Sequence, residues 1–151
     1  VLINNIDNIE EKEDEIKLLF EITNGSPGES ILLYDNDLFN LFDLTIKCIT
    51  KEISFSNHTY LTDLLVKLNN DQFKNYLFIL KSVLIILKKF KHNYYKSSEL
   101  ISKKIDNLRE TSQLISNKNI IARLEFLIKN ENDLFIYNLD KRIFMLNFLN
   151  T

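Results

Sequence analysis

The sequence has very few of the residues that build disulfides, metal sites and tight turns. Among 151 residues there are one cysteine, two histidines, one proline and two glycines, and there is no tryptophan. The lone Cys48 excludes a disulfide within the chain, and neither His58 nor His92 has a cysteine or carboxylate neighbour at metal-ligand spacing. Two glycines are also too few for a phosphate-binding loop, a dinucleotide-binding motif or a nucleophile elbow. These absences predict a protein that is not an enzyme and that carries no cofactor or metal.

The sequence contains neither a signal peptide nor a segment that could span a membrane. Its first 20 residues are acidic rather than basic and then apolar. The longest apolar run, residues 76–87, is interrupted by Lys81 and is shorter than the roughly 20 residues that a spanning helix needs. The chain begins at Val1 without a methionine, from which we expect a domain excised from a longer protein. With a single cysteine, the natural compartment is the reducing cytoplasm.

Charge is distributed unevenly along the chain. The net charge is −2, so no overall positive field favours nucleic acid. Residues 1–21 hold seven acidic side chains and two lysines, whereas the rest of the chain holds 14 acidic and 17 basic side chains. An anionic partner is therefore expected to contact the body of the domain and not its first segment.

Apolar residues recur at helical spacing along most of the chain. Both glycines and the proline fall within residues 25–28, and the absence of such residues elsewhere favours long helices over hairpins. Ile16, Leu19, Phe20 and Thr23 repeat at i, i+3, i+4 and i+7, as in one face of a helix. Further helices are predicted at about 38–49, 60–68, 72–90, 100–108 with a cap at Ser97-Ser98-Glu99, 119–129 and 134–149. The segment 72–90 is apolar on nearly all sides, which predicts a central buried helix. The sequence thus predicts one all-α domain over residues 1–151, a superhelical or α-solenoid-like bundle of about seven or eight helices.

Four segments resemble, in order, the ENTH domains of epsin-type trafficking adaptors. The residues 14–28 are similar to the first helix of that family and its Pro- and Gly-containing loop, and 64–69 to a helix-ending stretch. The run from Lys74 to Lys88 resembles the family's central helix, and 120–131 resembles the helix that ends its core. The resemblance covers roughly residues 4 to 135. It implies a right-handed superhelix wrapped around helix 72–90, and a helix after Leu134 as an additional element.

The same resemblance implies a function in membrane trafficking. Epsin-like members bind phosphoinositides through a basic pocket during clathrin-type vesicle formation and endocytosis, peripherally on plasma, vesicle, Golgi or endosomal membranes. Lys67, Lys74 and Lys81 match basic positions of this pattern, whereas Phe20 and Phe78 replace an expected arginine and histidine. The lysines favour a lipid-headgroup site, and the two rings favour a tepsin-like module that has lost the pocket and binds coat or adaptor proteins. An unrelated helical-repeat scaffold is the third alternative.

Three further features of the sequence have competing interpretations. Residues 1–9 have apolar side chains at 3, 6 and 9, as in a membrane helix, but the acids that follow favour a linker or helix edge. A basic cluster with interleaved aromatic residues contains Lys88, Lys89, Lys91 and Lys96. One interpretation is that it contacts phosphates or an acidic peptide. The other is that it is the C-terminal end of a helix, where lysines are stabilised by the helix dipole. Cys48 lies on an apolar helix face, which predicts a buried, inert thiol.

Overall fold

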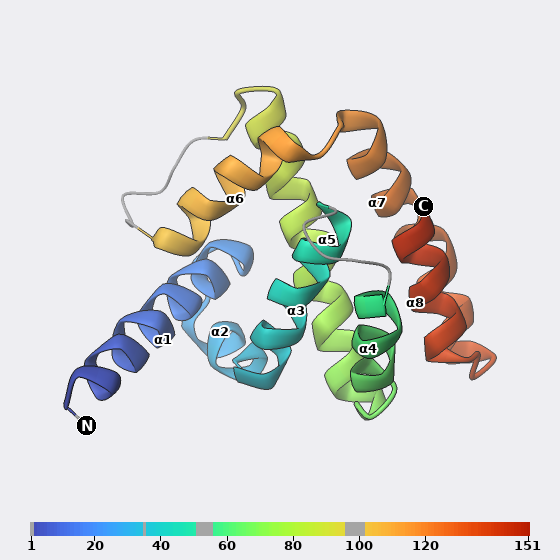
Figure 1. Ribbon diagram of the computed structural model, residues 1–151, viewed down its shortest axis with the longest axis horizontal. Coiled ribbons are helices and arrows are strands. Elements are labelled where there is room, and N and C mark those ends of the chain that lie inside the picture. The colour runs from blue at the N-terminus through green and yellow to red at the C-terminus, as the bar shows by residue number, and fades with distance from the viewer. Residues whose placement is uncertain (1, 35, 51–55, 96–101) are drawn as a thin grey trace.

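The described part of the chain is entirely helical. A computed structural model describes residues 2–34, 36–50, 56–95 and 102–151, and within these ranges it has eight helices and no strand. The helices are α1 (Leu2–Ile22), α2 (Pro27–Leu33), α3 (Asn36–Ile49), α4 (Ser56–Leu65), α5 (Asn70–Lys91), α6 (Lys103–Leu114), α7 (Asn117–Ile136) and α8 (Lys141–Asn150) (Figure 1). The predicted all-α class is therefore confirmed, whereas the right-handed superhelix stays a prediction.

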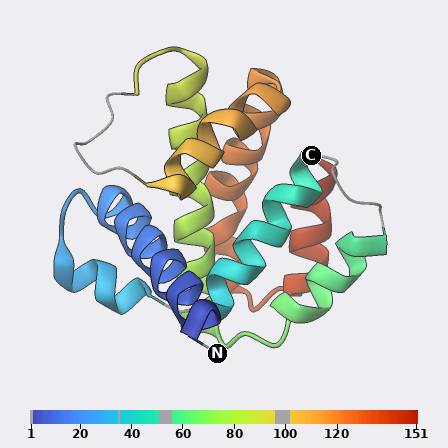
Figure 2. The same ribbon diagram turned by 60° about the vertical axis from the view of Figure 1, so that its left-hand side comes forward.

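Helix α5 forms the centre of the bundle, as the sequence predicts. It packs against α1, α3, α6 and α7, and it runs behind and between them in both ribbon views (Figures 1 and 2). Ten of its apolar side chains are buried. A helix that is apolar on most sides is stable only when other helices cover it, and four neighbours do so here.

The ends of α5 follow from local sequence. Asn69 accepts a hydrogen bond from the Gln72 backbone N–H at 2.8 Å, and the Gln72 side chain accepts one from the Asn69 N–H at 3.1 Å, which makes a capping box. At the other end, Asn93 adopts a left-handed φ of 56° and turns the chain away from the helix axis. The Asn-rich stretch that ends the predicted helix 60–68 therefore also starts α5.

The glycine- and proline-containing segment forms a helix, α2, that the apolar spacing of the sequence does not predict. Pro27 occupies the first turn of α2, where its missing N–H has no partner to lose, and Ser26 caps the helix by accepting from the Glu29 N–H. The preceding turn uses Asn24 and Gly25, which both have positive φ. The segment is thus the corner that sends α2 back against α1.

The boundary between the last two helices lies further along the chain than predicted. Helix α7 continues through residues 130–136, where a break was predicted, and the prediction of one helix over 134–149 is wrong. The break falls at residues 137–140, because Asn138 takes a left-handed φ of 49° and Asp140 caps α8 by accepting from the Arg142 and Ile143 N–H groups. The Asn-x-Asp pattern, and not the apolar spacing, marks this boundary.

Long-range polar contacts fasten the outer helices to the bundle. Helix α8 packs on α4, where Arg142 pairs with Asp63, and the Lys141 ammonium donates to the Leu68 carbonyl at 2.8 Å. Helix α6 begins at Lys103, and the cap predicted at residues 97–99 lies outside the described residues. Helix α6 also packs against α1, which places two segments about 90 residues apart in direct contact.

Candidate functional site

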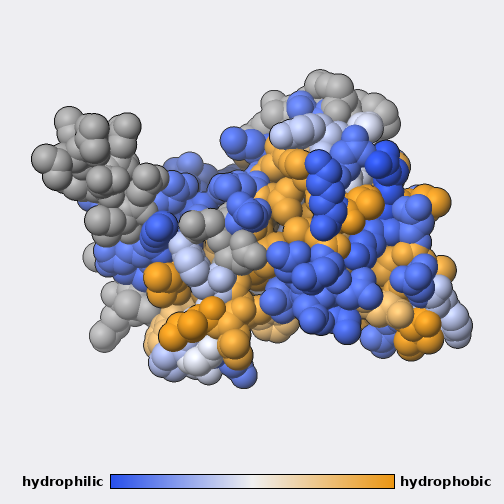
Figure 3. All heavy atoms as spheres, turned by 90° about the horizontal axis from the view of Figure 1, so that it is seen from below, coloured by the Kyte–Doolittle hydropathy of each residue, from blue (hydrophilic) through white to orange (hydrophobic). Residues whose placement is uncertain are grey.

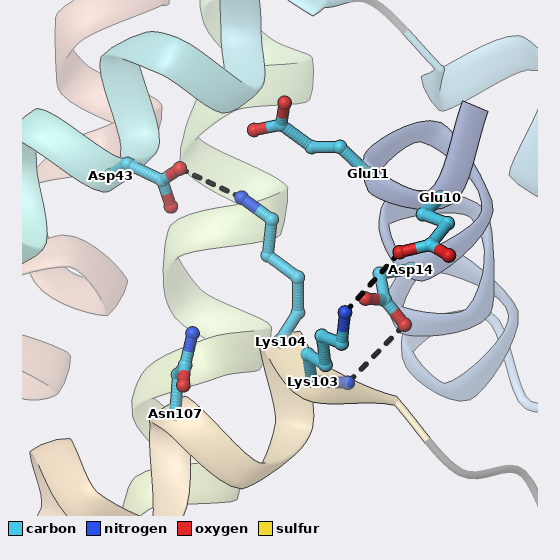
Figure 4. Close-up of a pocket in the computed structure, with 7 residues that line it drawn as sticks. All are labelled: Glu10, Glu11, Asp14, Asp43, Lys103, Lys104 and Asn107. Carbon is cyan, nitrogen blue, oxygen red and sulfur yellow. Dashed lines mark hydrogen bonds and ion pairs between the residues drawn. The ribbon is translucent and has the colours of Figure 1, made fainter. Parts of the chain in front are cut away.

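A charged cleft lies where α1, α3 and α6 meet. It has a volume of about 410 Å³. Four carboxylates, two ammonium groups and one amide line it, from Glu10, Glu11, Asp14, Asp43, Lys103, Lys104 and Asn107 (Figure 4). The spacing i, i+1 and i+4 places Glu10, Glu11 and Asp14 on one side of α1, and α6 supplies both lysines. The lining therefore carries two more negative than positive charges.

Lys104 is the cation at the base of the cleft. Its ammonium lies 2.7 Å from Asp43 Oδ2 and 3.8 Å from Glu15 Oε1. One ammonium therefore forms ion pairs with a carboxylate of α3 and a carboxylate of α1. Its side chain is only 14% exposed and its ammonium lies 5.9 Å from the centre of the Phe39 ring. Figure 4 shows the Glu11 side chain reaching from α1 into the same space. Negative charge thus exceeds positive charge around this ammonium.

Glu15 is a buried acid beneath this cleft. The residue is 4% exposed. Burial raises the pKa of its carboxyl, Lys104 partly offsets that effect, and the negative charges of Glu11 and Asp43 raise the pKa further. An additional cation in the cleft would lower this pKa, because it would stabilise the ionised form.

Asp14 holds the first turn of α6 in place. Ser102 precedes α6 but makes no capping bond with its side chain. Instead, Asp14 Oδ1 accepts from the Lys103 backbone N–H at 3.2 Å, and the Asp14 carbonyl accepts from the Ser102 hydroxyl at 3.4 Å. Lys103 also reaches Glu10, with 3.4 Å between Nζ and Oε2. One wall of the cleft is therefore fixed by contacts with partners far away in sequence.

The cleft continues into a more apolar hollow between α1, α3 and α6. This hollow has a volume of about 280 Å³ and shares Asp43, Lys104 and Asn107 with the charged cleft. Its other lining residues are Leu18, Phe42, Ile46, Lys47, Leu108 and Thr111. A ligand lying across both parts would meet carboxylates at one end and hydrocarbon at the other, an arrangement that suits a long basic side chain.

The three lysines predicted to bind a lipid headgroup do not form an open cluster of free charges. Lys81 pairs with Glu131 of α7, and both side chains are largely covered. The Lys74 ammonium lies 5.0 Å from the centre of the Phe135 ring, also on α7. Lys67 is exposed in the turn between α4 and α5. Two of the three lysines therefore contribute to the contact between α5 and α7.

The second predicted basic cluster lies at the end of α5. Lys88, Lys89 and Lys91 occupy its last turn, and Lys96 lies outside the described residues. Among the ion pairs of the described residues, none includes one of these three lysines. The His92 and Tyr94 rings stack beyond them with 6.2 Å between centres.

Three further predictions from the sequence concern the thiol of Cys48, metal binding and membrane-spanning helices. Cys48 is buried on α3, and burial raises the pKa of its thiol to about 11, which confirms the predicted buried position. Among the described residues, no group of three histidine, cysteine or acidic side chains is placed to hold a metal ion. In the same part of the chain, none of the helices combines the length and the apolar character needed to cross a bilayer.

The chain matches no protein-family model, no curated protein and no solved structure. The charged cleft was not found from sequence, because its carboxylates and lysines come from three segments separated by about 30 and 60 residues.

Proposed function

We propose that this chain is a non-enzymatic protein-interaction module that binds a basic segment of a partner protein in the cleft between α1, α3 and α6. The observation that carries the proposal is the excess of carboxylates around the largely covered ammonium of Lys104. Lys104 already lies beside Asp43 and Glu15, and Glu11 faces the same space. A lysine or arginine from a partner would supply the missing positive charge and would place its hydrocarbon stem against the apolar hollow.

The charge of the surrounding surface supports the same partner. Residues 10–49, which span most of α1 and all of α2 and α3, contain ten acidic side chains and three lysines. Such a surface attracts a basic segment over several ångströms and increases its association rate, and salt screens the effect. It also repels anionic membranes and nucleic acids from this side of the molecule.

Of the two trafficking functions suggested by the ENTH resemblance, this proposal follows the one in which the module binds proteins. Phosphoinositide binding through Lys67, Lys74 and Lys81 stays a prediction. The partners of Lys74 and Lys81 on α7 argue against it, because a headgroup would have to compete with Glu131 for the Lys81 ammonium. Membership of a vesicle coat is likewise a proposal, and it rests on the sequence resemblance.

Fluorescence polarisation with labelled amphipathic peptides tests the proposal. The panel holds Lys/Arg-containing peptides and versions in which glutamate replaces every basic residue. We expect the intact domain to bind basic peptides only, and the Glu11→Gln/Asp43→Asn variant to bind at least tenfold more weakly at low salt. The matched control Glu110→Gln/Glu125→Gln loses the same two charges at exposed positions outside the cleft and is expected to bind normally.

Three results would contradict the proposal. The first is equal binding of basic and charge-inverted peptides. The second is equal loss of binding in the cleft variant and the control, because general charge would then explain it. The third is binding that persists at full strength in the folded cleft variant, with circular dichroism establishing the fold.

A further inference from the structure

A basic surface at the end of α5 complements the acidic cleft. Lys88, Lys89 and Lys91 lie within the last turn of this helix. From α6, the Arg109 guanidinium lies 5.4 Å from the centre of the Phe90 ring, beside the same turn. The C-terminal end of a helix carries the equivalent of about half a negative charge, which one lysine would balance. The end of α5 therefore carries more positive charge than the helix dipole requires.

Tyr94 extends this surface with an exposed aromatic ring. The residue is 79% exposed, and its N–H donates to the Lys89 carbonyl at 3.0 Å, which ties it to the last turn of α5. The left-handed turn at Asn93 places it beyond the helix end. Lysines beside an aromatic ring match a cleft that has carboxylates at one end and an apolar hollow at the other. The end of α5 thus has the chemistry of the basic segment proposed as the ligand of the cleft.

The basic surface and the cleft lie on the same side of α1. Glu10 lines the cleft, and Glu21 accepts a hydrogen bond from the Tyr95 hydroxyl at 3.0 Å beside the end of α5. These two acids are eleven residues apart, close to three full turns, so they point to the same side of the helix. They are separated by about 16 Å along its axis, because each residue adds about 1.5 Å. The end of α5 therefore does not reach the cleft of its own molecule.

Helix α6 connects the same two surfaces. Lys103 and Lys104 line the cleft at its start, and Arg109 lies beside the end of α5 further along. Helices α1 and α6 both run from the cleft toward the basic surface, and both rise from left to right in Figure 1. A two-fold axis across this pair of helices exchanges its two ends in a second copy. The basic surface of each molecule then faces the cleft of the other.

From these observations we infer that two copies of this chain form a reciprocal dimer, in which the end of α5 of each molecule occupies the charged cleft of the other. The inference rests on the proposed function, because the second copy is a ligand of the same cleft. Charge complementarity selects this occupant, since four carboxylates and two lysines line the cleft, whereas three lysines and Arg109 lie at the end of α5 beside Glu21. The dimer also regulates the cleft, because a basic partner segment must displace the second copy in order to bind.

This dimer is held together mainly by charge and is therefore sensitive to salt. Viewed from below (Figure 3), on the side away from the end of α5, the described residues show separate hydrophobic patches divided by a broad hydrophilic area. That side shows no single broad apolar face among the described residues that would give a competing, salt-insensitive interface. Attraction between exposed charges falls off within a Debye length, about 8 Å at physiological ionic strength. We therefore expect a weak dimer that high salt dissociates.

Analytical ultracentrifugation of the whole domain tests the inference. We expect a monomer–dimer equilibrium at low salt and at protein concentrations up to about 1 mM, and a monomer at high salt. Lys88→Ala/Lys89→Ala/Lys91→Ala (the α5 variant) and Glu11→Gln/Asp43→Asn (the cleft variant) each remove one side of both contacts. Each variant alone should therefore dimerise about tenfold more weakly or not at all. Mixed together, the two should form a heterodimer, because the basic end of the cleft variant can still enter the cleft of the α5 variant.

Matched variants separate this contact from general charge. Lys67→Ala/Lys74→Ala/Lys129→Ala removes three exposed lysines away from the end of α5, and Glu125→Gln/Asp133→Asn removes two exposed acids of α7 outside the cleft. Both controls should dimerise like the original protein. A basic peptide that binds the cleft should convert the dimer to monomer, whereas its charge-inverted version should leave the dimer intact.

The inference is overturned if the original protein stays monomeric at low salt and about 1 mM. It is also overturned if either variant, shown to be folded by circular dichroism, dimerises as well as the original, or if the mixed variants form no heterodimer. Species larger than a dimer that grow with concentration would show open chains and would reject the reciprocal contact.

These outcomes are distinguishable from failure of the cleft proposal. A domain that binds basic peptides in the cleft but stays monomeric rejects the dimer alone. A dimer that both variants lose, in a domain that binds no basic peptide, rejects the external partner and supports the second copy as the ligand of the cleft.

Discussion

Two buried hydroxyl groups at the centre of the bundle give the most exact prediction for stability. Thr45 of α3 and Tyr76 of α5 are both fully buried, and their oxygens are in hydrogen-bond contact. The Thr45 hydroxyl has a single proton, and it donates that proton to the Leu41 carbonyl at 2.7 Å. The Tyr76 hydroxyl must therefore be the donor between the two side chains, and Thr45 the acceptor.

Because Tyr76 donates and Thr45 accepts, removing one hydroxyl should lower the free energy of unfolding by a different amount from removing the other. Tyr76→Phe removes the donor and leaves Thr45 with its own proton still bonded, so we expect a loss of about 1 kcal/mol. Thr45→Val removes the acceptor and leaves the Tyr76 O–H buried without a partner, which costs about 1–3 kcal/mol in addition. Removing both partners with groups of similar shape is nearly neutral, so the double variant should be more stable than Thr45→Val alone.

Urea unfolding followed by circular dichroism measures all four proteins of this double-mutant cycle. For a domain of this size, each 1 kcal/mol corresponds to about 2–4 °C in Tm, which gives an independent check. Tyr137→Phe is the control, because Tyr137 is 69% exposed, and its stability should be unchanged. Equal costs for the two single variants, or strict additivity in the double variant, would refute the assigned direction of the hydrogen bond.

Three further predictions concern other parts of the bundle. Lys81→Ala leaves Glu131 without its cation and should lower the free energy of unfolding by about 1 kcal/mol. The control Lys67→Ala removes an exposed lysine and should change that free energy by less than about 0.5 kcal/mol. Urea titrations measure both variants, and equal small changes would show that the Lys81–Glu131 pair does not stabilise the fold. Because burial raises the pKa of the Cys48 thiol to about 11, a thiol reagent at pH 8 should label the folded protein far more slowly than the urea-unfolded protein, and equal rates would show that the thiol is accessible. Glu15 has a pKa raised above its unfolded value of about 4.5 by burial, so its contribution to stability is present below that pH and is lost as the pH rises through the folded pKa. Glu15→Gln should therefore flatten the fall in stability that begins as the pH rises above about 4.5, and a variant with an unchanged slope would contradict the raised pKa of Glu15.

Much of the fold could be predicted from the sequence, because most helices bury a periodic apolar face. Helices α3 and α5 lie within two residues of their predicted ends at both termini. The failures share one cause, since apolar spacing says little about where a chain turns. Helix α2 is missed because Pro27 reads as a helix breaker, although it is compatible with a first turn. The break before α8 is missed because Ile136, Leu139 and Ile143 keep a helical period although all three are exposed.

Of the candidate sites, the one formed by neighbouring residues could be predicted from the sequence, and the one formed by separate helices could not. The lysines at the end of α5 are contiguous in sequence, and their clustering could be predicted. The cleft could not, because it depends on the packing of α6 against α1, and no local pattern specifies which helices meet. Likewise, the spacing of Lys74 and Lys81 predicts that they share one side of a helix, but not that Phe135 and Glu131 cover that side.

The hydrogen bond from the Lys103 backbone to Asp14 has a consequence for how the domain folds. It joins residues 89 positions apart, so the first turn of α6 receives its cap only after the two ends of a long loop have met. Until α1 docks, the start of α6 has an unsatisfied N–H group and should fray. Amide hydrogen exchange would then report α1 and the first turn of α6 opening together as one cooperative unit.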